Sequence, residues 1–234
     1  MKNKTIVIAG AGKGIGLSIA GILAAENNVI SLSRNLTEEL EELNTNFHQI
    51  DVVNDSLESI EVPEEVHALF YCPGSINLKP FNRLSANDFM KDYQQSVIGA
   101  VQIIQKFLPA LKKSGNAGIV LFSTVAVQTG MPFHASVAAA KGAIEGLGRS
   151  LAAEFASLNI RVNVIAPSLT DTPLASNLLS TPEKREASAK RHPLQRIGTA
   201  DEIAQTAVYL VSENASWITG QVIGVDGGMS SLKV

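Results

Sequence analysis

The chain of 234 residues carries a net charge of −3, with 45% hydrophobic, 18% charged and 5% aromatic residues. This length suits one large α/β domain, and no change in composition marks a boundary, so we expect a single domain over residues 1–234. The slight negative charge leaves no excess of cations for a phosphate backbone or an anionic membrane, which argues against nucleic-acid and membrane partners. Cys72 is the one cysteine, which excludes an internal disulfide and favours a cytoplasmic protein.

Short apolar runs alternate with longer helical patterns, which is typical of βαβ units that build a parallel sheet. Strands are expected at residues 5–9, 28–33, 47–50, 66–71, 118–123, 161–166 and 222–225. Helices are expected at residues 16–26, 86–112, 135–158 and 200–211. Right-handed crossovers between these strands predict a Rossmann-like, doubly wound parallel α/β sheet of about seven strands, with helices on both faces.

The segment 168–198 has no strong periodicity and contains three prolines. We expect a loop with one or two short helices over the carboxyl ends of the strands, acting as a lid for the substrate. Closure of this lid would form a largely apolar pocket. The residues expected to line that pocket are Met131, Phe133, Leu169, Leu174, Leu178 and Leu179.

A glycine-rich turn of the pattern G-x-x-x-G-x-G follows the first strand and opens the first helix. Glycines let the backbone turn tightly and approach a pyrophosphate, and the amino end of the following helix offers unpaired N–H groups with a partial positive charge. The turn therefore predicts a nucleotide site. Its expected binding residues are Gly10, Gly12, Lys13, Gly14, Ile15 and Gly16.

This turn and several later motifs resemble the short-chain dehydrogenase/reductase family, and the resemblance covers nearly the whole chain. The later motifs are Asp51-Val52, Lys141 on a helix after the fifth strand, Arg161-Val162-Asn163, Ile165-Ala166-Pro167, Pro193 to Gly198 and Gly220 to Gly228. The resemblance is greatest to the branch that includes the 3-oxoacyl-carrier-protein reductases. It implies a nicotinamide dinucleotide cofactor, a small-molecule carbonyl substrate, and assembly as a homotetramer or homodimer.

The choice of cofactor follows from charge at the end of the second strand. An acidic residue there would accept hydrogen bonds from a ribose 2′-hydroxyl and repel a 2′-phosphate. Ser33 does neither strongly, whereas Arg34 and Lys13 supply two cations, which favours NADP(H) over NAD(H). Asp51 either holds the adenine or forms a turn or a helix cap. By the resemblance, further cofactor contacts fall on Val52, Gly74, Lys141, Pro167 and Thr172.

The resemblance places the family's catalytic tyrosine at Val137, four residues before Lys141, and valine cannot donate a proton. In the family the tyrosine gives the proton while hydride moves, and the lysine lowers its pKa. Thr124 stands at the position of the family's serine and keeps a hydroxyl, whereas Ser96 stands at the asparagine position and lacks the amide. Lys141 alone is unchanged among the four catalytic positions.

An active enzyme would therefore need another proton donor, and His134 is the leading candidate. It precedes Lys141 by seven residues, which is the tyrosine-to-lysine spacing of the family's enoyl-reductase relatives, and imidazoles titrate near neutral pH. Seven residues of helix span about 10 Å, so coupling between the two groups would be weak unless the chain bends. Tyr93 is a second candidate, although core packing explains it equally well.

Two functions stay open on the sequence. The first is an NADP(H)-dependent oxidoreductase that acts on a carbonyl or enone substrate with a non-standard proton donor. The second is a catalytically silent protein: an NADP(H)-binding sensor or partner subunit, or chiefly an assembly element whose helix at residues 135–158 packs against a copy of itself or a related active subunit. The scattered histidines and lone cysteine predict no metal site, and Ser123-Thr124 lacks the glycine-flanked turn of a hydrolase nucleophile. Hydride transfer is the chemistry that the sequence suggests.

Overall fold

The computed structural model describes residues 1–233 and contains a seven-stranded parallel sheet in the order β3-β2-β1-β4-β5-β6-β9. The strands are β1 (Thr5–Ala9), β2 (Asn28–Ser33), β3 (Asn46–Gln49), β4 (Ala68–Tyr71), β5 (Ala117–Phe122), β6 (Ile160–Pro167) and β9 (Val222–Val225). All seven predicted strands are present, with ends within two residues of the expected positions. The predicted fold class is confirmed.

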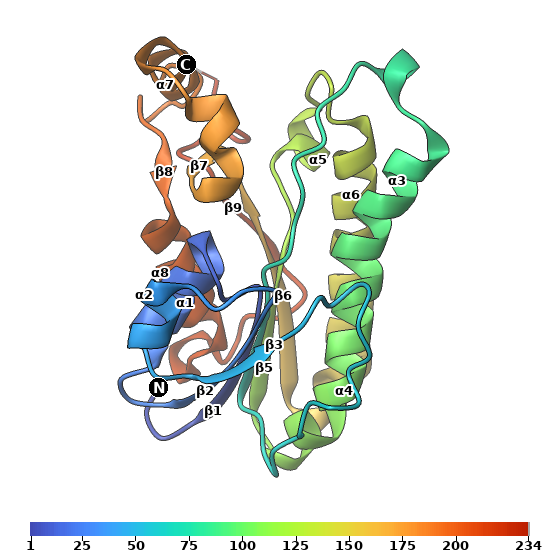
Figure 1. Ribbon diagram of the computed structural model, residues 1–234, viewed down its shortest axis with the longest axis vertical. Coiled ribbons are helices and arrows are strands. Elements are labelled where there is room, and N and C mark those ends of the chain that lie inside the picture. Colours follow the sequence, from blue (N-terminus) through green and yellow to red (C-terminus); the bar gives the residue numbers. More distant parts are fainter. Residues whose placement is uncertain (234) are drawn as a thin grey trace.

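Helices cover both faces of this sheet (Figure 1). The helices on one face are α1 (Gly14–Leu23), α2 (Glu38–Glu42) and α8 (Ala200–Val211), and those on the other are α3 (Ala86–Tyr93), α4 (Gly99–Lys113), α5 (Ala126–Thr129) and α6 (Ala135–Phe155). Successive side chains of a strand point to opposite faces. Accordingly, Ile6 and Ile8 of β1 join one hydrophobic core, while Val7 joins the other. Within residues 1–233, no helix combines the length and apolar character that a membrane crossing requires.

The prediction of a single helix over residues 86–112 is wrong, because a π-helical turn at Gln94–Ile98 separates α3 from α4. The Gly99 N–H donates to the Gln94 carbonyl, five residues back. The Gln95 carbonyl instead accepts a hydrogen bond from the Tyr71 hydroxyl of β4. A side chain inserted into a helical ladder in this way is a recognised cause of such a turn. Gly99 is needed there because a Cβ at that position would collide with the Tyr71 hydroxyl.

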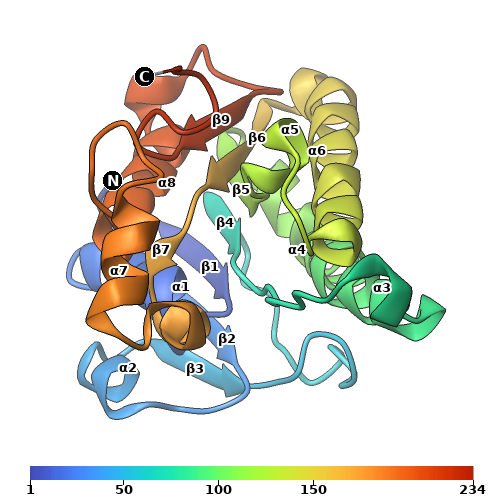
Figure 2. The same cartoon turned by 90° about the horizontal axis from the view of Figure 1, so that it is seen from above.

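The segment 168–198 contains the expected short helices. They are a 3-10 helix at Pro173–Leu179 and α7 (Pro182–Ala189). The segment also begins and ends in a small parallel pair, β7 (Thr170–Asp171) with β8 (Gly198–Thr199), which was not predicted because two-residue strands carry no periodicity. Figure 2 shows α7 on the side of the sheet opposite to α3 and α6, beside the carboxyl ends of the strands.

Candidate active site

The strand order reverses between β1 and β4, which are neighbours in the sheet. In doubly wound folds, ligands bind in the crevice at the carboxyl ends of the two strands at such a point. A cavity of about 500 Å³ lies there. The predicted cofactor residues that line it are Gly10, Gly12, Lys13, Gly14, Ile15, Gly16, Ser33, Arg34, Asp51, Val52, Gly74 and Thr172. The structure therefore brings together residues that lie far apart in the sequence.

The glycine turn leaves its backbone open to this cavity. Gly10 and Gly14 have φ angles of +81° and +58°, a region that side-chain-bearing residues rarely occupy. A Cβ at Gly12 would collide with the Ser33 hydroxyl, and one at Gly16 would collide with the Gly10 carbonyl. These positions therefore require glycine for the turn itself and for the close packing of α1 against β1.

The amino end of α1 is uncapped. Its N-cap residue, Lys13, makes no side-chain hydrogen bond, and no acidic residue lies in the first turn. The helices α3 and α8, by contrast, begin with complete capping boxes from Ser85 and Thr199. Free N–H groups and the positive end of the helix dipole at α1 thus face the cavity, which suits a phosphate.

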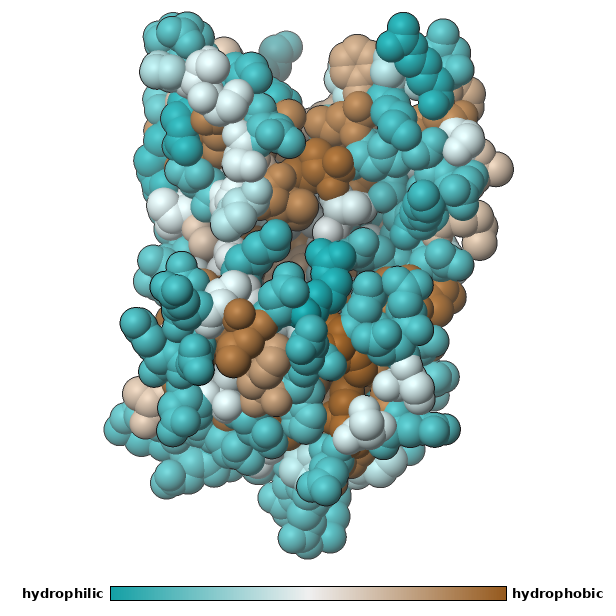
Figure 3. Space-filling model, in the orientation of Figure 1, coloured by the Kyte–Doolittle hydropathy of each residue, from teal (hydrophilic) through white to brown (hydrophobic). Residues whose placement is uncertain are grey.

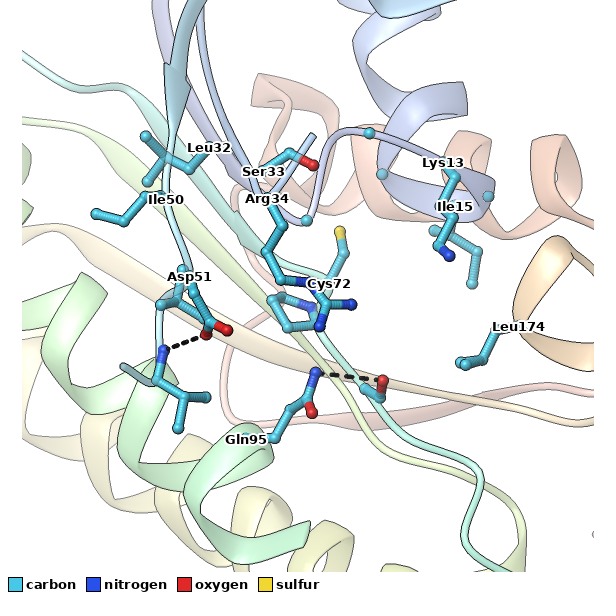
Figure 4. A pocket seen from close by; sticks show the side chains of 18 of the residues that line it. Lys13, Ile15, Leu32, Ser33, Arg34, Ile50, Asp51, Cys72, Gln95 and Leu174 are labelled. Carbon is cyan, nitrogen blue, oxygen red and sulfur yellow. Dashed lines mark hydrogen bonds between the residues drawn. The ribbon is translucent and has the colours of Figure 1, made fainter. Parts of the chain in front are cut away.

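Two of the predicted cofactor contacts in the first cavity are the cations Lys13 and Arg34. Figure 4 shows the Arg34 side chain extending from the end of β2 into the space between Asp51 and Lys13. The Asp51 carboxylate accepts hydrogen bonds from the Val53 N–H at 3.0 Å and the Asn54 side chain at 3.1 Å. The backbone hydrogen bond from Val53 is the main cause that lowers the pKa of Asp51, and Arg34 adds to it. Asp51 therefore forms a turn and also faces the cavity.

A second cavity of about 320 Å³ adjoins the first. The residues that line both are Ile15, Cys72, Gly74, Thr172 and Leu174. Thr124, His134, Val137, Lys141 and Pro167 line the second cavity only. Apolar residues gather in the hollow of the molecular surface between the two upper lobes in Figure 3, and hydrophilic residues surround it. A molecule in the first cavity would thus lie next to one in the second.

Lys141 is held in the wall of the second cavity with 7% of its surface exposed. Its Nζ donates a hydrogen bond to the Phe122 carbonyl at 2.9 Å. Burial lowers the pKa of Lys141 to about 8. The ammonium is therefore still the main form at neutral pH, but it gives up its proton far more readily than a surface lysine does.

Thr124 and His134 also present polar atoms to this cavity. The Thr124 hydroxyl oxygen accepts a hydrogen bond from the Ala126 N–H at 3.3 Å, which leaves its proton for a ligand. His134 lies at the N-cap of α6, and its Nδ1 donates to the Pro132 carbonyl at 2.7 Å because a carbonyl can only accept. In the neutral ring, Nε2 is then the basic nitrogen.

Several expected residues lie elsewhere. Ser96 is fully buried in the π-helical turn, its hydroxyl has no hydrogen-bond partner among the described residues, and it lines neither cavity. Tyr93 is 39% exposed and also lines neither. Leu179 is buried outside the second cavity, and Phe133, at a φ of +69°, turns outward with 56% of its surface exposed. The pocket predictions for Leu179 and Phe133 are therefore wrong, whereas Met131, Leu169, Leu174 and Leu178 line the cavity as expected.

Several polar residues of the second cavity were not predicted from the sequence, among them Ser168, Arg191 and His192. His192 is 2% exposed and pairs through Nε2 with the Ser168 hydroxyl at 2.8 Å. The one signal of these three residues in the sequence was membership of the segment 168–198.

Comparison with known proteins agrees with this architecture. The family profile described as enoyl-(acyl carrier protein) reductase matches residues 10–230. The 3-oxoacyl-[acyl-carrier-protein] reductase of Thermotoga maritima is 30% identical, and the match covers 98% of both chains. A tropinone reductase homolog of Arabidopsis thaliana is 41% identical over 67% of this chain, a match that spans 60% of the plant protein.

A solved structure from Beutenbergia cavernae, a proposed NAD(P)-dependent gluconate 5-dehydrogenase with NADP bound at low occupancy, is similar over 99% of this chain and 98% of that chain. Its TM-score is 0.90 and its sequence identity is 27%. These matches define an oxidoreductase class that binds nicotinamide dinucleotides. The chain belongs to the short-chain dehydrogenase/reductase family.

Proposed function

We propose that this protein is an NADP(H)-dependent oxidoreductase that interconverts a carbonyl, or an enone, and its reduced form. The observation that carries the proposal is the pair of adjoining cavities, one lined by the glycine turn and the other by Thr124 and Lys141. A nicotinamide dinucleotide fits the first cavity because the glycine turn and the uncapped end of α1 form a cradle for its pyrophosphate. When bound, the cofactor supplies or accepts the hydride.

Residues of the chain have separate roles in this proposal. Arg34 and Lys13 bind the 2′-phosphate, which selects NADP(H) over NAD(H). Lys141 binds the nicotinamide ribose, and Pro167 and Thr172 lie against the nicotinamide. The Thr124 hydroxyl donates a hydrogen bond to the substrate oxygen. The apolar residues of the segment 168–198 exclude water from the reacting atoms.

Two groups that face the second cavity can give the proton that a tyrosine would otherwise give. His134 offers an imidazole at the N-cap of α6, three residues before Val137. Lys141 offers an ammonium whose pKa, about 8, lies close to the pH of the cell. Substitution separates the two candidates, because His134→Gln removes the first donor and Lys141→Met the second. Loss of turnover in His134→Gln with unchanged NADPH affinity identifies His134 as the donor, whereas full turnover in His134→Gln leaves Lys141, which also binds the ribose, as the donor.

The second candidate function is an NADP(H)-binding protein without turnover, acting as a sensor or a partner subunit. Val137 favours it, because a missing general acid costs about 10² to 10⁴ in rate. A panel of aldehydes, ketones and enones with NADPH separates the two functions. Oxidation of NADPH that depends on substrate supports the oxidoreductase. A protein that binds NADPH and oxidises it with no member of the panel contradicts the oxidoreductase and favours the silent protein.

We further propose a cytoplasmic homotetramer or homodimer. Trp217 at 99% exposure and Leu232 at 60% are large apolar side chains on the surface of one chain, as expected where a second copy packs. The single cysteine suits a reducing compartment. Light scattering after size exclusion tests the assembly, and a monomer at micromolar concentration would contradict it.

A further inference from the structure

The second cavity combines apolar walls with cationic groups. Lys141, Arg191 and two histidines line it, and within residues 1–233 none of its lining residues is Asp or Glu. Its apolar lining includes Ile76, Leu78, Met131, Leu169, Leu174 and Leu178. Such a wall is complementary to a ligand with an apolar body and a negatively charged end.

The Arg191 guanidinium lacks a carboxylate partner. Across the described part of the chain it forms no ion pair, and its Nη2 donates only to the thioether of Met131, at 3.6 Å. Thioether sulfur is a weak acceptor. Arg185 and Arg196 of the same region are instead paired with Asp171 and Glu202. Arg191 therefore keeps most of its five N–H donors for a ligand.

The chain that directly follows Arg191 is held by hydrogen bonds of His192 and Leu194. The Nδ1 of the next residue, His192, donates to the Ser188 carbonyl at 2.9 Å, and its Nε2 pairs with Ser168 at the end of β6. Two residues later, the Leu194 N–H donates to the Gly227 carbonyl at 3.2 Å. Binding by Arg191 would thus order only its own side chain, which reduces the entropic cost of binding.

Two carboxylates, the buried Asp92 and the partly buried Glu145, lie behind the wall and do not oppose an anion directly. Asp92 accepts a hydrogen bond from Ser75 at 2.5 Å, and Glu145 accepts one from Ser123 at 2.8 Å. Both serines line the second cavity, whereas neither carboxylate does. The serine hydroxyls therefore stand between the carboxylates and a ligand.

We propose that the second cavity takes a monocarboxylate with an apolar chain, and that Arg191 binds its carboxylate group. The planar guanidinium can hold a carboxylate through two parallel hydrogen bonds. The apolar chain lies along the leucines of the segment 168–198. This inference rests on the proposed oxidoreductase for one point only, that the substrate also presents a carbonyl to Thr124 and Lys141.

Binding of hexanoate and hexanamide, measured by calorimetry on the full chain with NADP⁺ and without it, tests the carboxylate site independently of turnover. The two probes have the same chain and differ in charge. We expect hexanoate to bind about tenfold more tightly, because a charge-assisted bidentate pair is lost in the amide. Arg191→Gln should abolish this difference, and Arg191→Lys should restore part of it.

Lys190→Gln is the matched control, since Lys190 is the adjacent cation, pairs with Glu186 on the surface and lines neither cavity. It should keep the preference for hexanoate. Equal affinities for the two probes, no binding of either, or a preference that survives in Arg191→Gln would overturn the carboxylate site. Loss of the preference in Lys190→Gln as well would also overturn it, because general surface charge would then be the cause.

Turnover separates the two proposals. Oxohexanoic acids and their primary amides are compared as substrates with NADPH, and the acids should have the higher kcat/KM through a lower KM. Selective binding of hexanoate without turnover of any acid would contradict the oxidoreductase and keep the carboxylate site. Equal kcat/KM for acids and amides would overturn the carboxylate site and keep the oxidoreductase.

Discussion

Val137 lies one helical turn before Lys141 on α6, and both side chains line the second cavity. Residues four apart in a helix share a face, so a longer side chain at position 137 would reach the space in front of the lysine ammonium. The cavity of about 320 Å³ provides that space. Valine thus leaves space at the position where the family has the phenol of its catalytic tyrosine.

Val137→Tyr should therefore create or raise carbonyl reductase activity. A hydroxyl beside Lys141 would have a lowered pKa and would act as general acid, with a gain in kcat of about 10² to 10⁴. Steady-state oxidation of NADPH on the ketone panel measures it. Val137→Phe is the control, because it adds the ring without the hydroxyl. An equal gain in both variants would show that packing, and not proton donation, is responsible.

Arg34→Ala should weaken NADPH binding about tenfold and leave NADH binding nearly unchanged, because only NADPH carries the 2′-phosphate. Fluorescence titration with each cofactor measures the two dissociation constants. Arg83→Ala, an exposed arginine that lines neither cavity, should change neither constant. Equal losses for NADPH and NADH in Arg34→Ala would contradict the assignment of the phosphate to this residue.

Lys141→Met should stabilise the free protein at pH 7 by about 2 kcal/mol. Burial lowers the pKa of Lys141 from 10.5 to about 8, so the folded chain loses this proton before the unfolded chain does. The resulting penalty is complete below pH 8 and disappears as the pH rises to 10.5. This penalty on the folded chain amounts to about 3 kcal/mol. Lys141→Met removes the penalty but also loses the hydrogen bond to Phe122, which offsets about 1 kcal/mol of the gain. Urea unfolding of both proteins at several pH values tests this, and a gain that does not shrink with pH would contradict it.

Gly99→Ala should destabilise the fold by about 2 kcal/mol, because the new Cβ collides with the Tyr71 hydroxyl. Tyr71→Phe removes that hydroxyl, so the effect of Gly99→Ala should be much smaller in the double variant. Thermal unfolding of the four proteins gives the coupling energy. Additive effects of the two substitutions would mean that Tyr71 does not hold the π-helical turn open.

Local signals explain what could be predicted from the sequence. The glycine turn of Gly10 to Gly16 and the apolar strands are short-range patterns, so they predicted the sheet and the residues around the first cavity. The π-helical turn was not predictable in this way. It depends on Tyr71, which reaches the Gln95 carbonyl from a strand more than twenty residues earlier in the chain.

The residues of the second cavity could likewise be predicted from the sequence only in part. Its apolar residues could be predicted from the sequence, but Arg191 lies in its wall beside His192, which pairs with Ser168 from far earlier in the chain. Phe133 leaves the pocket because its backbone adopts a left-handed conformation, which nothing in a phenylalanine indicates. Side-chain roles that depend on tertiary hydrogen bonds or on unusual backbone angles cannot be predicted from the periodicity of the sequence.

A calorimetric titration of the purified protein with NADPH and with NADH tests the proposed cofactor site most directly. The two adjoining cavities and the cations Lys13 and Arg34 predict saturable binding of NADPH at one site per chain, about tenfold tighter than that of NADH. No saturable binding of either cofactor up to about 1 mM, or tighter binding of NADH, would contradict an NADP(H) site in this protein.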